Sequence, residues 1–511
     1  MNKAGSKMNN PLYDELFGVH SKNDDTFLYM INGQTITYRE FLANSRRIAN
    51  ALVNLGLKPG DCVAIQVEKS PEMLNIYAAC AQAGLVFLPL NPTYTVDETK
   101  YFLENSGSRL IICDEKNKEG LNFIIKNLAI LIETLNSDST GSIIDKATSS
   151  SEEFKTAKRS KDDLAALLYT SGTTGKSKGA MLSQTNLLSN GKTLMNAWKF
   201  NKDDILLHAL PLFHTHGLFV ATNVILASGA SMVFLPQFNL DNIINYLPTA
   251  STMMGVPTFY TRLLADKRFN RQLVSHMRLF VSGSAPLLSE THNQFEKLTG
   301  HKILERYGMT ETNMNTSNPY HGERRAGTVG LPLSGVEVKI TEPKTGETLS
   351  NNEIGQIEVR GPNVFTGYWG LPNKTKADLR ENGFFITGDL GKIDEDGYVH
   401  IIGRDKDLII SGGYNIYPKE LEVFLDSKNG ILESAVIGIP HPDFGETPIA
   451  IIVASKDAAP DLQAIENDIN KSIARYKHPR KMIIVEELPR NAMGKVQKNI
   501  LRDTYSSTFE A

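Results

Sequence analysis

The sequence has little cysteine and no excess of charge of either sign. Only three cysteines occur among 511 residues, and Cys62, Cys80 and Cys113 are unevenly spaced in the first quarter of the chain. This suits neither a disulfide framework nor a metal cluster and favours a reducing compartment. Lys and Arg number 54 against 57 Asp and Glu, a formal net charge of −3. The balance excludes a basic field broad enough to bind nucleic acid or a membrane surface.

Long apolar runs are also lacking. The most apolar stretch, residues 76–90, contains Gln82, Gly84 and Pro89 and is shorter than the roughly 20 residues of a membrane-spanning helix. Residues 1–11 precede no apolar stretch of the signal-peptide type and show no Arg-rich import pattern. We therefore expect a cytoplasmic protein. The composition leaves open whether it forms a homodimer.

The length suggests roughly three domain-sized units of about 150 residues each, and the periodicity predicts α/β layers. A helical pattern at residues 38–55 alternates with buried-strand runs at 63–67, 86–90 and 110–113. Residues 136–163 are rich in Ser, Thr, Lys and Glu, so we expect an exposed connection that separates two subdomains. Further runs at 167–169, 232–235, 253–256 and 279–281, with a helix at 185–198, predict a second parallel-rich sheet.

After residue 328 the pattern changes to short alternating strands, at 336–340, 356–360 and 398–402, which predict a small β-rich subdomain. The last hundred residues mix helix and strand again. We therefore predict an α/β fold with a large N-terminal domain, residues 1–404, made of layered sheets and helices plus the β-rich subdomain. A small, mobile α+β domain, residues 405–511, follows.

The strongest local signal is a loop rich in glycine and hydroxyl groups, residues 170–179 (TSGTTGKSKG), directly after an apolar strand. Glycine lets backbone N–H groups approach phosphate oxygens, and Ser, Thr and Lys add donors and charge. The predicted phosphate-binding residues are Thr170, Ser171, Gly172, Thr173, Thr174, Gly175, Lys176 and Lys178. A flexible surface loop is the alternative. A P-loop of an NTPase or kinase is disfavoured, because Thr170 stands where that turn needs glycine.

This loop resembles the phosphate loop of the adenylate-forming superfamily, which includes acyl-CoA synthetases. Further motifs follow in the order typical of that family: 211–217 (PLFHTHG), 282–286 (SGSAP), 306–311 (RYGMTE), 387–389 (TGD), 403–407 (GRDKD), 411–415 (SGGYN) and 491–495 (NAMGK). Residues 305–320 and the doublet His214 and His216 are most similar to the malonyl-CoA synthetase group. The resemblance implies a ligase that uses ATP and CoA, with Mg²⁺, to form an acyl-AMP and then a thioester.

The resemblance also assigns roles residue by residue. Lys495 is the catalytic lysine that bridges the carboxylate and the α-phosphate, and Lys406 is the hinge of the C-terminal domain. Glu311, with Thr170, is the expected Mg²⁺ ligand, since Mg²⁺ prefers oxygen. The implied nucleotide site further comprises Ser284, Ala285, Pro286, Glu305, Tyr307, Gly308, Thr310, Asp389 and Arg404. The implied CoA loop comprises Ser411, Gly412, Gly413 and Tyr414.

The acyl substrate is predicted from charge. A second carboxylate needs a fixed cation or donors when it leaves water, and Arg306, next to Tyr307, supplies the cation. Ser284 and His216 are further candidate donors, and His214 is a candidate for closing the pocket or contacting the reacting carboxylate. The alternatives are that Arg306 pairs with Glu305 or points to solvent, and that His216 is an ordinary core histidine.

We therefore expect a malonate–CoA ligase that also accepts methylmalonate. A general short-chain acyl-CoA synthetase remains the alternative, and Arg306 discriminates the two. An NTPase or kinase, which would release ADP, and a catalytically silent binding protein fit the motifs less well. CoA is the preferred acceptor because no carrier-protein segment is found in the chain, although a separate carrier protein stays open.

Overall fold

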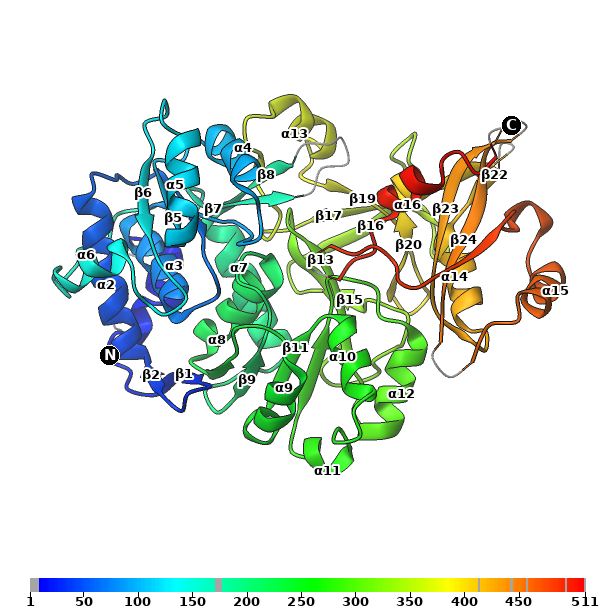
Figure 1. The fold of residues 1–511 in the computed structure, drawn as a ribbon, viewed down its shortest axis with the longest axis horizontal. Coiled ribbons are helices and arrows are strands. Elements are labelled where there is room, and N and C mark those ends of the chain that lie inside the picture. Colours follow the sequence, from blue (N-terminus) through cyan, green and yellow to red (C-terminus); the bar gives the residue numbers. More distant parts are fainter. Residues whose placement is uncertain are drawn as a thin grey trace.

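The computed structural model describes residues 9–170, 177–411, 414–441, 444–455, 458–491 and 494–509. Within them the strands form four sheets, two in the large N-terminal part, one in a β-rich subdomain and one in the C-terminal part (Figure 1). This confirms the predicted fold class. None of the described helices has both the length and the apolar composition needed to cross a bilayer.

The first sheet has seven strands in the order β18-β8-β7-β4-β3-β5-β6. Its central strands are parallel and fully buried, as expected where helices cover both faces. The strands are β3 (Cys62–Gln66), β4 (Val86–Pro89), β5 (Leu110–Cys113), β6 (Leu131–Thr134), β7 (Leu164–Thr170), β8 (Lys178–Ser183) and β18 (Gly367–Tyr368).

The connection at residues 136–163 does not separate two subdomains, so that expectation is wrong. Strand β7, which follows it, returns to the first sheet and pairs with β4, with Phe87 opposite Ala166. The connection also contains helix α6 (Ser142–Thr148) and is tied to helix α2 (Tyr38–Asn54) through Asn50, whose Nδ2 donates to two of its carbonyls. An apolar run shows that a strand is buried, but not which sheet it joins.

The second sheet has nine strands in the order β15-β14-β13-β12-β11-β9-β10-β1-β2. It contains the predicted runs 232–235, 253–256 and 279–281, but not 167–169. Its strands are β1 (Thr26–Met30), β2 (Thr35–Thr37), β9 (Ile205–His208), β10 (Ser231–Phe234), β11 (Thr252–Gly255), β12 (Leu279–Ser282), β13 (Leu304–Met309), β14 (Asn313–Ser317) and β15 (Leu331–Pro332).

Helices pack on both sheets, and one apolar cluster joins the layers. Val63 of β3, Ile76 of α3, Leu187 of α7 and Met232 of β10 all belong to that cluster. Helix α2 begins with a capping box between Thr37 and Glu40, which satisfies free N–H groups of its first turn. The other helices of this part are α1 (Pro11–Leu16), α3 (Pro71–Ala83), α4 (Val96–Ser106), α5 (Glu115–Ile124), α7 (Gln184–Ala197), α8 (Asn223–Ser228), α9 (Leu240–Tyr246), α10 (Pro257–Leu264), α11 (Arg271–Val274) and α12 (Ser289–Thr299).

Two smaller sheets complete the molecule. The β-rich subdomain has the order β16-β17-β19-β20, all antiparallel, as the alternating pattern predicts. Its elements are β16 (Glu337–Thr341), β17 (Gly355–Arg360), β19 (Phe385–Ile393) and β20 (Val399–Arg404), with helix α13 (Pro372–Asp378) beside it.

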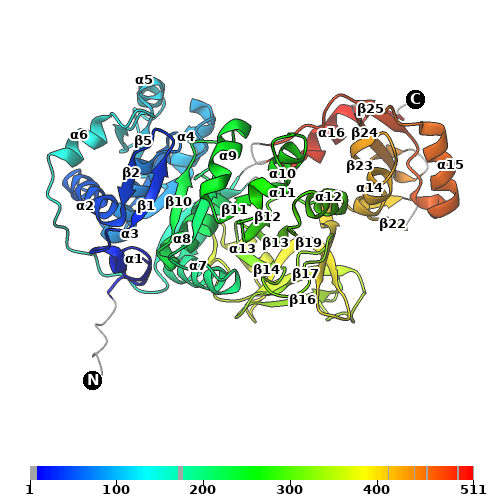
Figure 2. The same ribbon diagram turned by 90° about the horizontal axis from the view of Figure 1, so that it is seen from below.

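The C-terminal sheet lies at one end of the molecule (Figure 2). Its path is β22-β21-β24-β23, and β25 pairs with β24. The elements are β21 (Ile409–Ser411), β22 (Tyr414–Ile416), β23 (Ile431–His441), β24 (Gly445–Ala454), β25 (Met482–Val485), α14 (Pro418–Asp426), α15 (Leu462–Ser472) and α16 (Lys498–Tyr505). The predicted boundary after residue 404 falls where β20 ends and the short helix η4 (Asp405–Asp407) begins.

Candidate active site

A buried cation lies on strand β13 of the nine-stranded sheet. Arg306 of β13 is 3% exposed, and its Nε and Nη2 have no hydrogen-bond partner in the described structure. The guanidinium lies flat against Gly283, where a Cβ would come within 2.4 Å of Cζ of Arg306. Burial lowers the pKa of Arg306 to about 9. An unpaired buried cation is costly, so this position favours an anionic ligand.

Neither alternative for Arg306 is realised. It is buried rather than pointed to solvent, and no ion pair with Glu305 forms among the described residues. One carboxylate oxygen of Glu305 instead accepts a hydrogen bond from the backbone N–H of Leu287 at 3.2 Å, and the other has no partner. Burial raises the pKa of Glu305 to about 8. Burial therefore favours the protonated form of Glu305, which weakens the negative charge that it presents to Arg306.

Two neutral histidines and a serine adjoin the cation. His216 Nδ1 is 3.1 Å from Ser284 Oγ, and the backbone N–H of His216 donates to Nδ1 of His214 at 3.4 Å. Burial lowers the pKa of His214 to about 4 and that of His216 well below its usual range, and Arg306 adds to both effects. His216 Nε2 is buried without a partner. A histidine that satisfies all its hydrogen bonds in the core would not leave this atom free, so the arrangement favours a role at the pocket.

A second cluster suits a nucleotide. Asp389 accepts hydrogen bonds from Tyr307 Oη at 2.5 Å and forms an ion pair with Arg404 Nε at 2.7 Å. Burial, followed by the charge of Asp389, raises the pKa of Tyr307 well above its usual value. Strands β19 and β20 place Asp389 directly opposite Arg404 in register. The structure therefore brings together Tyr307, Asp389 and Arg404, the residues that the sequence predicts to bind adenine and ribose.

The carboxylate of Glu311 lies in the turn between β13 and β14. It is 5% exposed, accepts a hydrogen bond from Tyr368 Oη at 3.0 Å, and its pKa is raised by burial. Gly308 is required for the tight turn, because a Cβ there would be 1.8 Å from the carbonyl oxygen of Asn313. Thr310 lies in the same turn.

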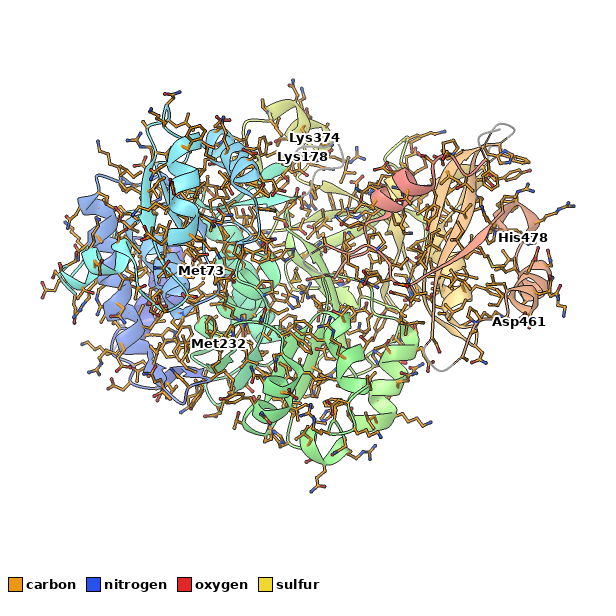
Figure 3. All side chains as sticks on the ribbon, viewed as in Figure 1. Met73, Lys178, Met232, Lys374, Asp461 and His478 are labelled. Atoms are coloured by element: carbon orange, nitrogen blue, oxygen red, sulfur yellow. The ribbon has the colours of Figure 1, made fainter. Side chains whose placement is uncertain are left out.

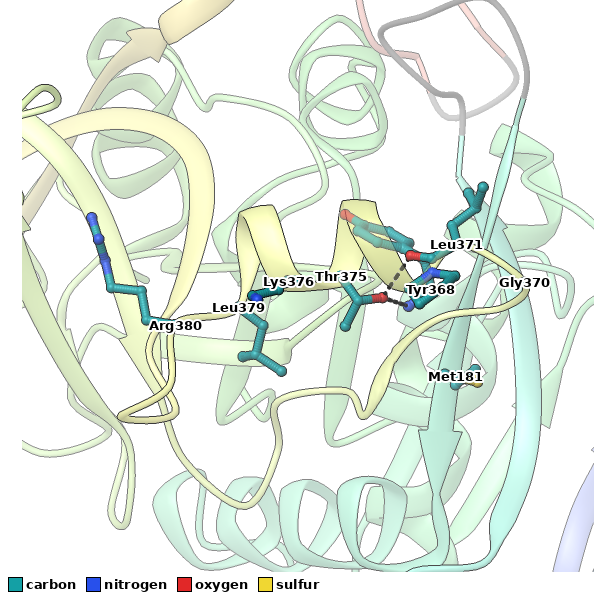
Figure 4. A pocket seen from close by; sticks show the side chains of 9 residues that line it. Met181, Tyr368, Gly370, Leu371, Thr375, Lys376, Leu379 and Arg380 are labelled. Carbon is teal, nitrogen blue, oxygen red and sulfur yellow. Dashed lines mark hydrogen bonds between the residues drawn. The ribbon is translucent and has the colours of Figure 1, made fainter.

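Tyr368 is a partner of Glu311 that the sequence motifs do not reveal. Its backbone N–H donates to Thr375 Oγ1 at 2.9 Å, and that hydroxyl donates to the carbonyl of Leu371 at 3.1 Å (Figure 4). These residues, with Met181, line a surface depression next to α13. Helix α13 therefore fixes the backbone of Tyr368, and no charge or motif pattern in the sequence indicates this.

The phosphate loop is described only at its ends. Thr170 ends β7 and Lys178 begins β8, opposite each other in register. Lys178 Nζ lies over the ring of Tyr368 at 4.8 Å. Burial, followed by the charge of neighbouring Lys374, lowers the pKa of Lys178. Figure 3 labels both lysines at this side of the molecule. The other predicted residues of this loop, Ser171, Gly172, Thr173, Thr174, Gly175 and Lys176, lie outside the described residues.

Lys495 of the C-terminal domain reaches the space between the two clusters. Its backbone N–H donates to Asn491 Oδ1 at 3.0 Å, and a Cβ on Gly494 would be 3.5 Å from Thr258 of the N-terminal domain. The side chain remains accessible to solvent. Partial desolvation, followed by the positive charge of Arg404, lowers the pKa of Lys495 to about 8. Because Lys495 also lowers the pKa of His214, it interacts with groups of both clusters.

The remaining predicted residues divide into two groups. Ala285 and Pro286 follow β12 beside Ser284, and Lys406 lies in η4, close enough to lower the pKa of Lys178 and Lys495. In contrast, Ser411 is buried in β21, while Tyr414 is 60% exposed and its ring packs at a tilt against that of Tyr476 of its own domain. Gly412 and Gly413 lie outside the described residues. No hydrogen bond, ion pair or ring contact joins the described residues of this predicted CoA loop, Ser411 and Tyr414, to Arg306 or His216.

The model of the AMP-binding enzyme family matches residues 18–369, and that of the AMP-binding enzyme C-terminal domain matches residues 420–495. The chain therefore belongs to the AMP-binding enzymes, and it is an acid–CoA ligase of the adenylate-forming type. Among curated proteins it is 32% identical to a malonate–CoA ligase of Arabidopsis thaliana, over 98% of this chain and 89% of that protein. It is also 32% identical to a long-chain-fatty-acid–CoA ligase of Bacillus subtilis, over 92% and 90%.

Among solved structures the chain is similar to ATP-bound MatB from Rhodopseudomonas palustris, at 52% identity over 98% of this chain and 100% of that one, with a TM-score of 0.97. The apo form of the same protein, at equal identity and coverage, gives 0.86. Since sequence and coverage do not differ, the difference in TM-score reflects conformation. The present arrangement is closer to the ATP-bound form.

Proposed function

We propose that the chain is an ATP-dependent ligase that joins malonate to CoA by way of malonyl-AMP. The observation that carries the choice of acid is the buried Arg306, whose Nε and Nη2 have no partner in the part of the chain that the structure describes. Among the curated relatives, sequence identity alone does not discriminate, because malonate, long-chain fatty acid and feruloyl enzymes are about equally similar to this chain. A dicarboxylate supplies the anion that Arg306 lacks, whereas acetate or a fatty acid would leave the cation unpaired.

In the first half-reaction, we infer, the distal carboxylate binds Arg306 with the help of His216 and Ser284. The other carboxylate then lies toward His214 and Lys495 and attacks the α-phosphate of ATP, so that pyrophosphate leaves. The ammonium of Lys495 bridges the carboxylate and the phosphate, where negative charge gathers. Asp389 is placed to accept hydrogen bonds from the ribose hydroxyls, with Arg404 beside it.

Mg²⁺ is part of the proposal. Glu311 provides a buried carboxylate next to the ends of the phosphate loop, and Thr170 provides a hydroxyl. No group of three or more potential metal-ligating side chains occurs among the described residues. This donor set fits Mg²⁺, which keeps several waters and binds phosphate oxygens alongside one or two carboxylates. When bound, the ion would neutralise charge on the phosphates.

The second half-reaction requires a different arrangement of the C-terminal domain. Lys495 now occupies the approach to the reacting carbon, while Tyr414 is exposed on its own domain. We infer that residues 405–511 rotate about Lys406, which withdraws Lys495 and brings the loop of Ser411, Gly412, Gly413 and Tyr414 to the pocket. The CoA thiol then attacks the acyl carbon and AMP leaves.

The test is a substrate panel with the purified protein, ATP, Mg²⁺ and CoA. We expect malonate to give the highest kcat/KM, methylmalonate to be accepted, and AMP and pyrophosphate to be the products. If acetate or a medium-chain acid is preferred to malonate, the enzyme is a general acyl-CoA synthetase. Release of ADP would contradict both assignments. Acceptance of methylmalonate, a cytoplasmic location and a homodimer are finer parts of the proposal, and each needs its own measurement.

A further inference from the structure

A lysine outside every motif connects the two large sheets. Lys69 follows β3 of the seven-stranded sheet, and His208 ends β9 of the nine-stranded sheet. Lys69 Nζ is 2.8 Å from Nδ1 of His208 and 2.9 Å from its carbonyl oxygen, and it lies over the ring of Phe234 at 4.4 Å. No carboxylate pairs with Lys69 within the described parts of the chain. The lysine is therefore held by hydrogen bonds and an aromatic ring rather than by an ion pair.

These contacts fix the tautomer of His208. Nε2 of His208 is 2.9 Å from the carbonyl oxygen of Gly217, which can only accept, so the proton of the neutral ring is on Nε2 and Nδ1 is an acceptor. Burial lowers the pKa of Lys69 well below its usual value, but an N–H of Lys69 can donate to Nδ1 whether or not the amine is charged. Both contacts are therefore compatible with the same tautomer. Burial lowers the pKa of His208 well below its usual value, and Lys69 adds to this.

The carbonyl that His208 holds belongs to the residue after His216. Gly217 lies in a π-helical segment, η2 (His216–Thr222), and its carbonyl also accepts from Thr222 Oγ1 at 2.9 Å. The backbone is closely packed here, because a Cβ on Gly217 would be 2.1 Å from the carbonyl oxygen of Pro211. This peptide directly follows His216, whose Nδ1 is 3.1 Å from Ser284 Oγ.

We propose that Lys69 is a positioning residue for substrate recognition: through His208 and the Gly217 carbonyl, it holds His216 in place to bind the distal carboxylate of the diacid. The proposal rests on the proposed function, because His216 serves there as a donor to that carboxylate. Lys69 itself does not touch the substrate. It acts on the acyl half of the site and not on the nucleotide half, where Asp389 and Arg404 belong to other strands.

The test compares Lys69→Met with Lys58→Met, the same change at an exposed lysine of the same domain. Loss of one charge-assisted hydrogen bond that positions a donor should raise the KM for malonate about tenfold, with the KM for ATP within about twofold of the parent. Lys58→Met should behave as the parent protein. Unchanged malonate kinetics in Lys69→Met would overturn the proposal, and so would an equal loss in the malonate and ATP parameters, since that indicates a general structural role.

A second measurement does not depend on the folding of the variant. In parent protein labelled with ¹⁵N-histidine, the His208 resonances, assigned with a His208→Gln variant, should show a proton on Nε2 at neutral pH. A proton on Nδ1 would overturn the proposal. The control for the proposed function is the parent enzyme with malonate. If the parent does not form malonyl-CoA, the proposed function fails. If the parent is active and Lys69→Met has unchanged malonate kinetics, only the positioning role of Lys69 is refuted.

Discussion

Replacement of Arg306 by methionine is the most direct test of the acyl pocket. Methionine keeps an unbranched side chain against Gly283 but removes the charge and the two unpaired donors, Nε and Nη2. A hydrogen bond to a charged group contributes about 1.5–3 kcal/mol net, so the loss of two amounts to about 3 kcal/mol at the lower bound. At 1.4 kcal/mol for each factor of ten, kcat/KM for malonate should fall by roughly 100-fold or more.

In the same variant, acetate activity, stability and ATP binding should not decrease. Acetate has no second carboxylate, so its kcat/KM should stay near the parent value or rise. The ligand-free variant should have a higher free energy of unfolding, because a buried cation without a partner is removed. The KM for ATP should not change, since Asp389 and Arg404 are untouched.

The assay is malonate-dependent exchange of labelled pyrophosphate into ATP, with Arg306→Lys as the control that keeps the charge but not the planar fork. Arg306→Lys should fall between the parent and Arg306→Met. The reasoning is refuted if Arg306→Met uses malonate as well as the parent does, or if malonate and acetate lose activity to the same extent. In the second case Arg306 supports the fold of the site and does not select the acid.

Four further predictions concern three other residues. Lys495→Ala should abolish malonyl-AMP formation but leave thioester formation from supplied malonyl-AMP largely intact, and equal loss of both would contradict its role. The pKa of Lys495 is lowered to about 8, so kcat/KM for ATP should decline as the pH rises through that value. The variant Lys495→Arg should not show this decline. The same pH profile for both proteins would contradict the assignment of the decline to Lys495. Asp389→Asn weakens the contacts to Tyr307 and Arg404. The KM for ATP should therefore rise about tenfold while the KM for malonate stays constant. A change confined to the KM for malonate would be inconsistent with a ribose site. Glu305 binds its proton more tightly in the folded state, with a pKa of about 8. The free energy of unfolding should therefore fall as the pH rises from about 4.5 to 8. The slope should be at most about 1.4 kcal/mol per pH unit. Urea denaturation at both ends of that range should show the slope in the parent and not in Glu305→Gln.

The sequence predicts the separate elements well but not all their partners. Helix α2 and strand β5 have nearly the expected bounds, since periodicity and burial are local properties. Strand β7 was expected in the second sheet and joins the first. Strand β1, near the N-terminus, pairs with β10, about two hundred residues later. Pairing between such distant segments depends on the packing of whole layers, which an apolar run does not encode by itself.

The candidate site shows the same division. Motifs indicate Lys495, Asp389 and Glu311, because the chemistry needs those residue types within short, glycine-containing segments. They do not indicate Tyr368 or Lys69, whose hydrogen-bond partners, Glu311 and His208, are far away in the chain. A lone tyrosine or lysine has no local pattern that separates it from a core or surface residue.

The order of residues along the chain alone determined the class of reaction, the need for ATP and CoA, and the presence of a cation suited to a second carboxylate. Only the tertiary structure decided that Arg306 is buried with Nε and Nη2 unpartnered among the described residues, that Glu305 forms no ion pair with it there, and that Lys495 interacts with both His214 and Arg404. The reason is physical. The type of a side chain fixes which bonds it can form, but its desolvation and its neighbours, which set its charge and its ligand, depend on surfaces contributed by distant parts of the chain.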